Sequence, residues 1–296
     1  METVKGKTII ITGASAGVGE ATAKLCAAEG ANVVIAARSK KELMALAKSL
    51  GKNALAVVTD VAKTQDCTAL LNAAVEKFGQ IDGLVNNAGF NSRGAVEAVA
   101  LEAMEQIIEV NLKAPIRLCK MVLPHLRASG GGAIVNVASL AGRVPLDHEA
   151  TYSASKFGLR GFSFAMAEEL HGTGITVSVV SPGPIDTGFI MTDIEGVPDM
   201  VFSQPMSSAD DVARAIIASL KDGKRERVMN VMSGILANLA YFAPSLRTAL
   251  KPRLEAKGRV SNQVKCNLPL AAQRRHSHFA QFDYSLHCGG RINNPM

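Results

Sequence analysis

The sequence predicts an α/β protein with a doubly wound parallel sheet, helices on both faces of it, and a C-terminal extension. Short apolar segments rich in Val and Ile alternate with longer Ala-rich segments, as strands and helices alternate in βαβ units. The apolar segments are hydrophobic almost without interruption, which indicates strands buried on both faces. Hydrophobic residues make up 48% of the 296 and aromatic residues 4%, a composition that excludes the disordered and collagen-like classes.

Each element is expected from its own run of residues. The first strand is the apolar run TIIIT, and NVVIAA and AIVNVAS mark later strands of the same character. In order, the strands are expected at residues 8–12, 33–37, 54–59, 83–86, 133–138 and 176–181. The segments between and after them predict helices at residues 18–29, 40–49, 64–78, 101–126, 154–171 and 209–220. No internal repeat or linker divides residues 1–220.

Positive charge is concentrated in the last quarter of the chain. The net charge is +6, but residues 1–220 hold 19 Lys and Arg against 22 Asp and Glu, a net of −3. Residues 221–296 hold 13 and 4, a net of +9. These cations are not interleaved with stacking aromatic residues and form no nucleic-acid motif, so we expect no nucleic-acid partner. The histidines at 171, 276, 278 and 287 form no recognisable ligand spacing, so no metal site is expected.

A glycine-rich turn follows the first expected strand. The run T-G-A-S-A-G-V-G at residues 12–19 leads into an amphipathic helix. Glycines at a strand-to-helix turn let the backbone bend tightly and approach a pyrophosphate, whose charge the helix N-terminus favours. A plain glycine-rich turn is the alternative. We interpret the run as a Rossmann-like dinucleotide site, with cofactor-binding candidates Gly13, Ser15, Gly17, Val18 and Gly19.

The end of the second expected strand bears on which dinucleotide is bound. An enzyme that uses NAD carries a ribose-binding carboxylate about 20 residues after the glycines. This chain has Arg38 and Ser39 there instead, and the next residue is a lysine. An arginine donates a forked pair of charge-assisted hydrogen bonds to a phosphate, so the sequence favours NADP(H) over NAD(H). A solvated cation at the start of a helix is the alternative.

Four polar residues are candidates for catalysis, namely Asn111, Ser139, Tyr152 and Lys156. Tyr152 and Lys156 are four residues apart, a spacing that places both on one face of a helix. A nearby ammonium group and an oxidised nicotinamide both favour the phenolate anion, so Tyr152 is a candidate for moving a proton to or from a carbonyl oxygen. The pair alone is not specific, and Ser139 by itself is an ordinary loop hydroxyl.

The order of these motifs resembles the short-chain dehydrogenase/reductase family, of the type that prefers NADP. The resemblance is carried by T-G-x3-G-x-G at 12–19, N-N-A-G at 86–89, Asn111, Ser139, Tyr152-x3-Lys156 and Pro182-Gly183, and spans residues 5 to about 225. It implies a Rossmann-fold oxidoreductase in which Ser139 holds the substrate oxygen and Tyr152 is the general acid. Lys156 would bind the nicotinamide ribose and lower the tyrosine pKa, and Asn111 would hold a water that links Lys156 to solvent.

The same resemblance implies further cofactor contacts. Asp60 and Val61 are similar to the family's adenine contacts, and Asn87, Ala88 and Gly89 to the backbone wall beside the cofactor. The nicotinamide carboxamide would be held by Pro182, Gly183, Ile185 and Thr187. Asp60 as a strand-end cap, Asn87 as a turn former and Thr187 as a helix cap are the alternatives. A homodimer or homotetramer is also implied.

These residues predict NADPH-dependent reduction of a ketone or aldehyde, or the reverse oxidation of an alcohol. Activity on 3-oxoacyl groups of acyl carrier protein is one alternative, and a non-catalytic dinucleotide-binding scaffold is another. The loops expected to contact substrate, at 90–94, 140–149 and 189–206, are rich in Met, Phe, Leu and Val, which suggests an apolar substrate.

The chain is expected to comprise a catalytic domain at 1–225, a hydrophobic and basic segment at 226–260, and a disordered tail at 261–296. The middle segment packs on the domain as a strand and helix, lies at an oligomer interface, or contacts a membrane surface through 228–259. The N-terminus has only a three-residue apolar run before Gly13, and the five cysteines form no C-x-x-C pair, so we expect a cytoplasmic protein.

Overall fold

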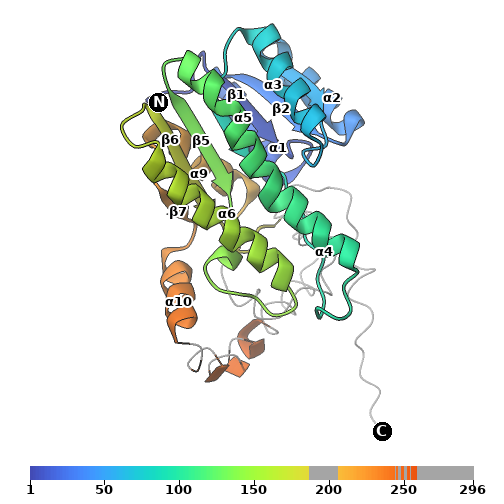
Figure 1. Cartoon of the computed structure of the whole chain (residues 1–296), viewed down its shortest axis with the longest axis vertical. Coiled ribbons are helices and arrows are strands. Elements are labelled where there is room, and N and C mark those ends of the chain that lie inside the picture. The colour runs from blue at the N-terminus through green and yellow to red at the C-terminus, as the bar shows by residue number, and fades with distance from the viewer. Residues whose placement is uncertain (187–205, 244, 246–247, 250–251, 254, 259–296) are drawn as a thin grey trace, which may run out of the picture.

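The fold is a seven-stranded, wholly parallel sheet in the order β3-β2-β1-β4-β5-β6-β7, seen in a computed structural model (Figure 1). The structure describes residues 1–186, 206–243, 245, 248–249, 252–253 and 255–258. The strands are β1 (Thr8–Thr12), β2 (Asn32–Ala37), β3 (Ala54–Val58), β4 (Gly83–Asn86), β5 (Gly132–Val137), β6 (Ile175–Ser181) and β7 (Glu226–Val228).

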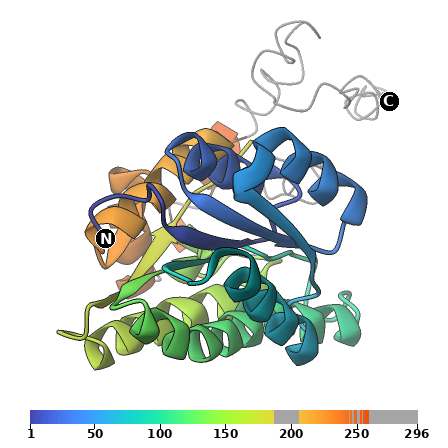
Figure 2. The ribbon, with the colours of Figure 1, turned by 90° about the horizontal axis from the view of Figure 1, so that it is seen from above.

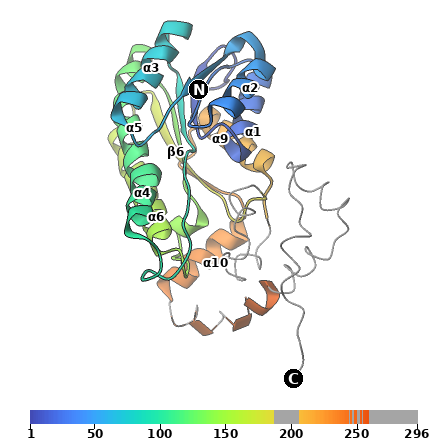
Figure 3. The same cartoon turned by 90° about the vertical axis from the view of Figure 1, so that its right-hand side faces the viewer.

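Helices cover both faces of this sheet, so the prediction of a doubly wound sheet is confirmed. Figure 3 shows one layer on each side, and Figure 2 shows the same layers from above. One layer holds α1 (Gly17–Ala28), α2 (Lys40–Leu50) and α9 (Ala209–Asp222). The other holds α3 (Thr64–Phe78), α4 (Leu101–Ile108), α5 (Ala114–Ala128) and α6 (Ala150–Glu169).

Alternation along the central strands explains their continuous hydrophobicity. Ile9 and Ile11 of β1 belong to the core beneath α1, α2 and α9, whereas Ile10 belongs to the core beneath α3, α5 and α6. All three side chains are fully buried. Because successive side chains point to opposite faces of a strand, a sheet covered on both faces needs apolar residues at every position.

Two of the predicted helices differ from the structure by more than one or two residues at an end. The single helix expected at 101–126 is interrupted by a π-helical turn at Glu109–Lys113, so that α4 and α5 are separate elements. A π turn inserts an extra residue, which turns a side chain away from the regular helical face. The helix expected to begin at residue 154 begins at Ala150, where the backbone carbonyl of Glu149 accepts a hydrogen bond from Ser153 N.

The sheet continues past the domain boundary expected at residue 225. Residues of β7 pair in parallel with Val179, Val180 and Ser181 of β6, which makes β7 the edge strand. It is followed by α10 (Val231–Phe242), so this part of the segment is a strand and then a helix. The expected tail at 261–296 lies outside the described residues. In the part of the chain that the structure describes, no helix is both long and apolar enough to cross a membrane.

Candidate active site

The carboxyl edge of the sheet gathers most of the candidate residues, beginning with the glycine loop between β1 and α1. Gly13 and Gly17 have left-handed φ values of 66° and 58°, which side chains other than hydrogen adopt at a cost. A Cβ on Gly19 would lie 2.2 Å from Gly13 O, so helix and loop touch through backbone alone. Ala16, the N-cap of α1, provides no side-chain hydrogen bond, which leaves the first backbone N–H groups of α1 without a side-chain acceptor. A loop with these glycines and an uncapped helix N-terminus is suited to binding the pyrophosphate of a dinucleotide.

Asn87 holds the glycine loop in this conformation. Its Nδ2 donates to Thr12 O at 2.9 Å and to Gly13 O at 3.2 Å. In the other direction, Thr12 Oγ1 accepts the backbone N–H groups of Asn87 and Ala88, each at 3.0 Å. Residues 87–89, the candidate backbone wall, and the glycine loop are therefore joined by hydrogen bonds. They follow β4 and β1, the neighbouring strands at which the order of strands in the sheet reverses direction.

Arg38 follows β2 at the same edge, and its side chain is exposed. Within the described part of the chain it makes no hydrogen bond or ion pair, so the guanidinium is available to an anion. Ser39 is the N-cap of α2 and makes no side-chain cap bond. Asp60 and Val61 follow the adjacent strand β3, and Asp60 Oδ1 accepts from Ala62 N at 3.1 Å.

Tyr152 and Lys156 are both buried on α6. The Lys156 Nζ atom lies 5.7 Å from the centroid of the Tyr152 ring and donates to Val137 O at 3.0 Å. The sequence spacing thus brings the two groups together as expected for residues one helical turn apart.

Burial shifts the pKa of each group in the direction that favours its neutral form. It lowers the pKa of Lys156 from 10.5 to about 8. The pKa of Tyr152 is raised well above 10.0, mainly by burial and then by the charge of Glu149, while a hydrogen bond with Ser139 and the charge of Arg93 act in the opposite direction. In the chain by itself the tyrosine pKa therefore rises, although the family resemblance implies that Lys156 lowers it. A neutral phenol is the form that donates a proton.

Ser139 and Asn111 approach this pair from different elements. Ser139 lies in the loop after β5, is hydrogen-bonded to Tyr152, and accepts from Ala141 N at 3.1 Å through its Oγ. The fully buried Asn111, in the π turn, accepts from Phe90 N at 3.0 Å and donates to Phe90 O at 2.9 Å. A Cβ on Gly89 would lie 3.1 Å from Asn111 Oδ1 and 3.6 Å from Lys156 Nζ, so both side chains border Gly89.

The candidate carboxamide contacts are only partly described. Pro182 and Gly183 follow β6, and Pro182 O accepts a hydrogen bond from Leu140 N at 2.8 Å, next to Ser139. Ile185 forms an isolated parallel bridge with Ser207. Thr187 lies outside the described residues, as does all of the expected substrate loop at 189–206 except Met206.

Sequence reasoning missed a buried ion pair beside Tyr152. Arg93 Nε and Glu149 Oε1 are 2.8 Å apart, and their side chains are 8% and 5% exposed. The pair joins the loop after β4 to the start of α6. A backbone hydrogen bond from Gly94 N to His148 O, at 2.9 Å, joins the same two segments. The two residues are 56 positions apart, so no local spacing marks them as partners.

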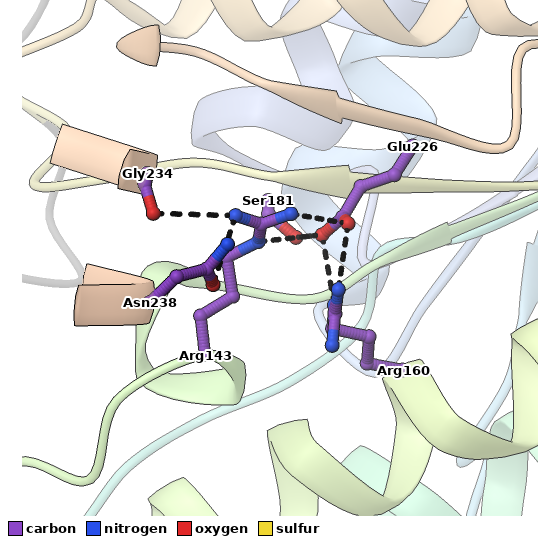
Figure 4. A network of polar contacts seen from close by, with 6 residues as sticks. All are labelled: Arg143, Arg160, Ser181, Glu226, Gly234 and Asn238. Atoms are coloured by element: carbon purple, nitrogen blue, oxygen red, sulfur yellow. Dashed lines mark hydrogen bonds and ion pairs between the residues drawn. The ribbon is translucent and has the colours of Figure 1, made fainter. Parts of the chain in front are cut away.

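A second missed feature is the set of polar contacts around Glu226, shown in Figure 4. The Glu226 carboxylate of β7 accepts hydrogen bonds from Arg143, Arg160 and Ser181 at 2.6 to 3.0 Å. Arg143 follows the 3-10 turn Leu140–Gly142 that Ser139 caps, and Arg160 lies one turn beyond Lys156 on α6. The contacts hold the pKa of Glu226 at about 2, although burial acts in the opposite direction.

The parallel sheet and the glycine loop fit a protein that binds a dinucleotide, and comparison with known proteins gives the family. The sequence model of the short chain dehydrogenase family matches residues 7–197. The chain therefore belongs to the short-chain dehydrogenase/reductase family and is an NAD(P)-dependent oxidoreductase.

Proteins named as ketoacyl or 3-oxoacyl reductases are among those that the chain resembles. It is 37% identical to ketoacyl reductase HetN of Nostoc sp. over 78% of this chain and 80% of that one. It is 34% identical to 3-oxoacyl-[acyl-carrier-protein] reductase FabG of Escherichia coli over 72% of this chain and 88% of that one. Among solved structures, 3-ketoacyl-(acyl-carrier-protein) reductase from Brucella melitensis complexed with NADH matches with a TM-score of 0.70 and 33% identity, covering 76% of this chain and 96% of that one.

Gly19→Ala tests the close approach at the glycine loop. The added methyl group overlaps the backbone of Gly13, so the loop must shift, and we expect NAD(P)H to bind at least about tenfold more weakly. Gly161→Ala is the control, because a Cβ there meets nothing within 4 Å. Fluorescence titration with NADH and NADPH measures both variants. Unchanged affinity in Gly19→Ala would contradict the assignment of the loop.

The depressed pKa of Lys156 predicts a pH dependence of stability. Between pH 8 and 10.5 the unfolded chain holds the Lys156 proton more tightly than the folded protein does, so the free energy of unfolding rises with pH in this interval. The rise amounts to about 3 kcal/mol over the whole interval and is absent in Lys156→Met. Urea unfolding at a series of pH values measures the difference between wild type and variant. A difference that stays constant with pH would show that Lys156 is not desolvated.

Proposed function

We propose that the protein uses NADPH to reduce the carbonyl group of a ketone or aldehyde to an alcohol, with the reverse oxidation available at the same site. The observation that carries this proposal is the hydrogen bond between Ser139 and a buried Tyr152 whose pKa is raised, beside the Lys156 ammonium. The hydroxyl groups of Ser139, in the loop after β5, and of Tyr152, on α6, contact each other and form a place for one carbonyl oxygen.

Ser139, Tyr152 and Lys156 have different roles in the proposed carbonyl reduction. A bound nicotinamide cofactor supplies the hydride that reaches the carbonyl carbon. Ser139 donates a hydrogen bond that holds the carbonyl oxygen, and Tyr152 transfers its phenolic proton to that oxygen as negative charge develops on it. The Lys156 ammonium, fixed by Val137 O, then stabilises the phenolate left on Tyr152.

Asn111 positions this machinery. Its amide makes two hydrogen bonds to the backbone of Phe90, which fixes the loop that begins at Asn87 and contains Gly89. The loop closes the space next to Lys156 Nζ. We retain the family-based role of Asn111 in a water-mediated proton path from Lys156 as part of this proposal.

A ketone is the substrate class that the relatives support. HetN, FabG and the Brucella enzyme are named as ketoacyl reductases, and the structurally similar L-sorbose reductase of Gluconobacter frateurii, with a TM-score of 0.70 and 30% identity, was solved with NADPH and L-sorbose. This match covers 77% of the present chain and 96% of the L-sorbose reductase chain. We therefore place 3-oxoacyl thioesters first among candidate substrates, ahead of simple ketones and aldehydes.

The preference for NADPH rests on Arg38. This cation lies at the end of β2, where a dinucleotide enzyme of this fold presents the group that meets the adenosine ribose. It is exposed and has no partner among the described residues, and no acidic residue stands at 36–40 to bind a ribose diol. A 2′-phosphate matches a guanidinium in both charge and geometry.

Tyr152→Phe separates an enzyme from a dinucleotide-binding scaffold. Removing the phenolic hydroxyl removes the proton donor, so kcat for 3-oxoacyl thioester reduction is expected to fall by about 10²- to 10⁴-fold while NADPH affinity stays within about twofold. NADPH oxidation followed by absorbance measures turnover, and fluorescence measures binding.

Tyr241→Phe is the matched control for this experiment, since Tyr241 lies on α10 and is half exposed. Full turnover in Tyr152→Phe would exclude it as the acid. Turnover absent from the wild type across 3-oxoacyl thioesters, ketones and aldehydes would favour the scaffold.

Arg38→Asp tests the choice of cofactor. The change removes a cation that donates hydrogen bonds to the 2′-phosphate of NADPH and puts in its place a carboxylate that repels the phosphate. KM for NADPH is therefore expected to rise about 10- to 100-fold, while KM for NADH changes little. Arg127→Asp makes the same change in net charge at an exposed position near the end of α5 and serves as the control. An equal loss for both cofactors in Arg38→Asp would remove Arg38 from the phosphate site.

A further inference from the structure

The helix α10 presents its large apolar side chains to solvent. Five of them are 47% to 82% exposed, at spacings of three or four residues that place them along one side of the helix: Met232, Ile235, Leu236, Leu239 and Phe242. The buried positions of the same helix carry the small residues Ser233, Gly234 and Ala237. An amphipathic helix of a globular protein normally has the opposite arrangement, with its large apolar residues facing the core.

Specific contacts hold α10 in this orientation. Arg143 donates to Gly234 O at 3.4 Å and to Asn238 Oδ1 at 3.3 Å, as Figure 4 shows. A Cβ on Gly234 would lie 2.9 Å from Val228 Cγ1, so a larger residue does not fit between α10 and β7. The Tyr241 ring packs 5.5 Å from the Phe157 ring of α6. Rotating the apolar stripe inward would break the contacts that attach the helix to the catalytic elements.

The stripe, defined as Met232, Ile235, Leu236, Leu239 and Phe242, lies at one end of the molecule. Figures 1 and 3 both show α10 beyond the end of the sheet. A contiguous exposed apolar surface of this kind marks a contact with another apolar phase or surface.

The charge pattern indicates which partner fits the stripe. Residues 228–246 contain no Lys, Arg, Asp or Glu. The next 13 residues, 247–259, contain five cations and one acid. Two of these cations, Arg253 and Lys257, are exposed in the described pieces of chain that follow α10. An apolar helical face followed by a cluster of Lys and Arg is the arrangement that binds anionic lipid surfaces.

We propose that α10 docks on an anionic lipid bilayer, with its apolar stripe inserted at the boundary between headgroups and acyl chains and with Arg253 and Lys257 among the cations that attract the headgroups. A helix of 12 residues is about 18 Å long, too short to cross a bilayer, so it lies in the interface. The proposal does not depend on the substrate or on the cofactor preference. It places the carboxyl edge of the sheet, with Ser139 and Tyr152, on the side of the protein that faces the lipid.

Vesicle sedimentation of the full 296-residue chain tests the proposal. The protein is expected to sediment with vesicles that contain phosphatidylglycerol and at least about tenfold less with vesicles of phosphatidylcholine alone. Raising the salt concentration from about 0.1 M to about 1 M is expected to weaken the binding, because it screens the cations.

A pair of leucine variants then isolates the stripe. Leu236→Glu places a charge in the stripe and is expected to reduce binding to anionic vesicles at least about tenfold. Leu101→Glu makes the same change at the start of α4, where the leucine is 64% exposed, and is expected to bind as the wild type does. Circular dichroism and thermal unfolding of both variants verify that the fold is kept.

Three results would overturn the proposal. One is a wild-type protein that does not sediment with anionic vesicles. Another is equal binding by Leu236→Glu and the wild type. The third is a dimer, measured by light scattering, that Leu236→Glu dissociates while wild type and variant bind lipid equally weakly; that result would assign the stripe to a second copy of the chain.

Discussion

The site depends on one constraint, that all seven strands of the sheet run in the same direction. Their carboxyl ends therefore meet at one edge, and the chain must leave that edge through loops. The glycine loop follows β1, Arg38 follows β2, Asn87 follows β4, Ser139 follows β5 and Pro182 follows β6. Between β1 and β4 the winding direction reverses, and the hydrogen bonds of Asn87 to Thr12 and Gly13 close the gap there.

Burial sets the electrostatics of Tyr152 and Lys156. Removing Tyr152 and Lys156 from water favours the neutral form of each, which raises one pKa and lowers the other. Hydrogen bonds limit the cost of that burial, with Val137 O accepting from Lys156 and Ser139 contacting Tyr152. The phenol is thereby held in its protonated form, and an ammonium in a site of low dielectric interacts strongly with any negative charge that forms beside it.

Ion pairs between residues far apart in the sequence hold the loops around Tyr152 and Lys156 in place. Arg93 and Glu149 tie the loop after β4 to the start of α6. Glu226 ties α6 to the turn after Ser139 and, through Arg143, to α10. Because charges as buried as these are costly when unpaired, each pair restricts where its loops can lie. These hydrogen bonds connect α10 to the carboxyl edge of the sheet.

The sequence alone determined the α/β class, six of the seven strands, the helices on both faces and the family, because hydrophobic periodicity and the glycine, Asn-Asn-Ala-Gly and Tyr-x3-Lys motifs are local. It placed Tyr152 and Lys156 on one helix for the same reason. Only the tertiary structure revealed the π turn at Asn111, the early start of α6, the edge strand β7 and the outward stripe of α10. The π turn, β7 and the orientation of α10 are fixed by partners distant along the chain, such as Phe90 for Asn111 and Arg143 for Glu226. Residue patterns within one segment carry no record of such partners.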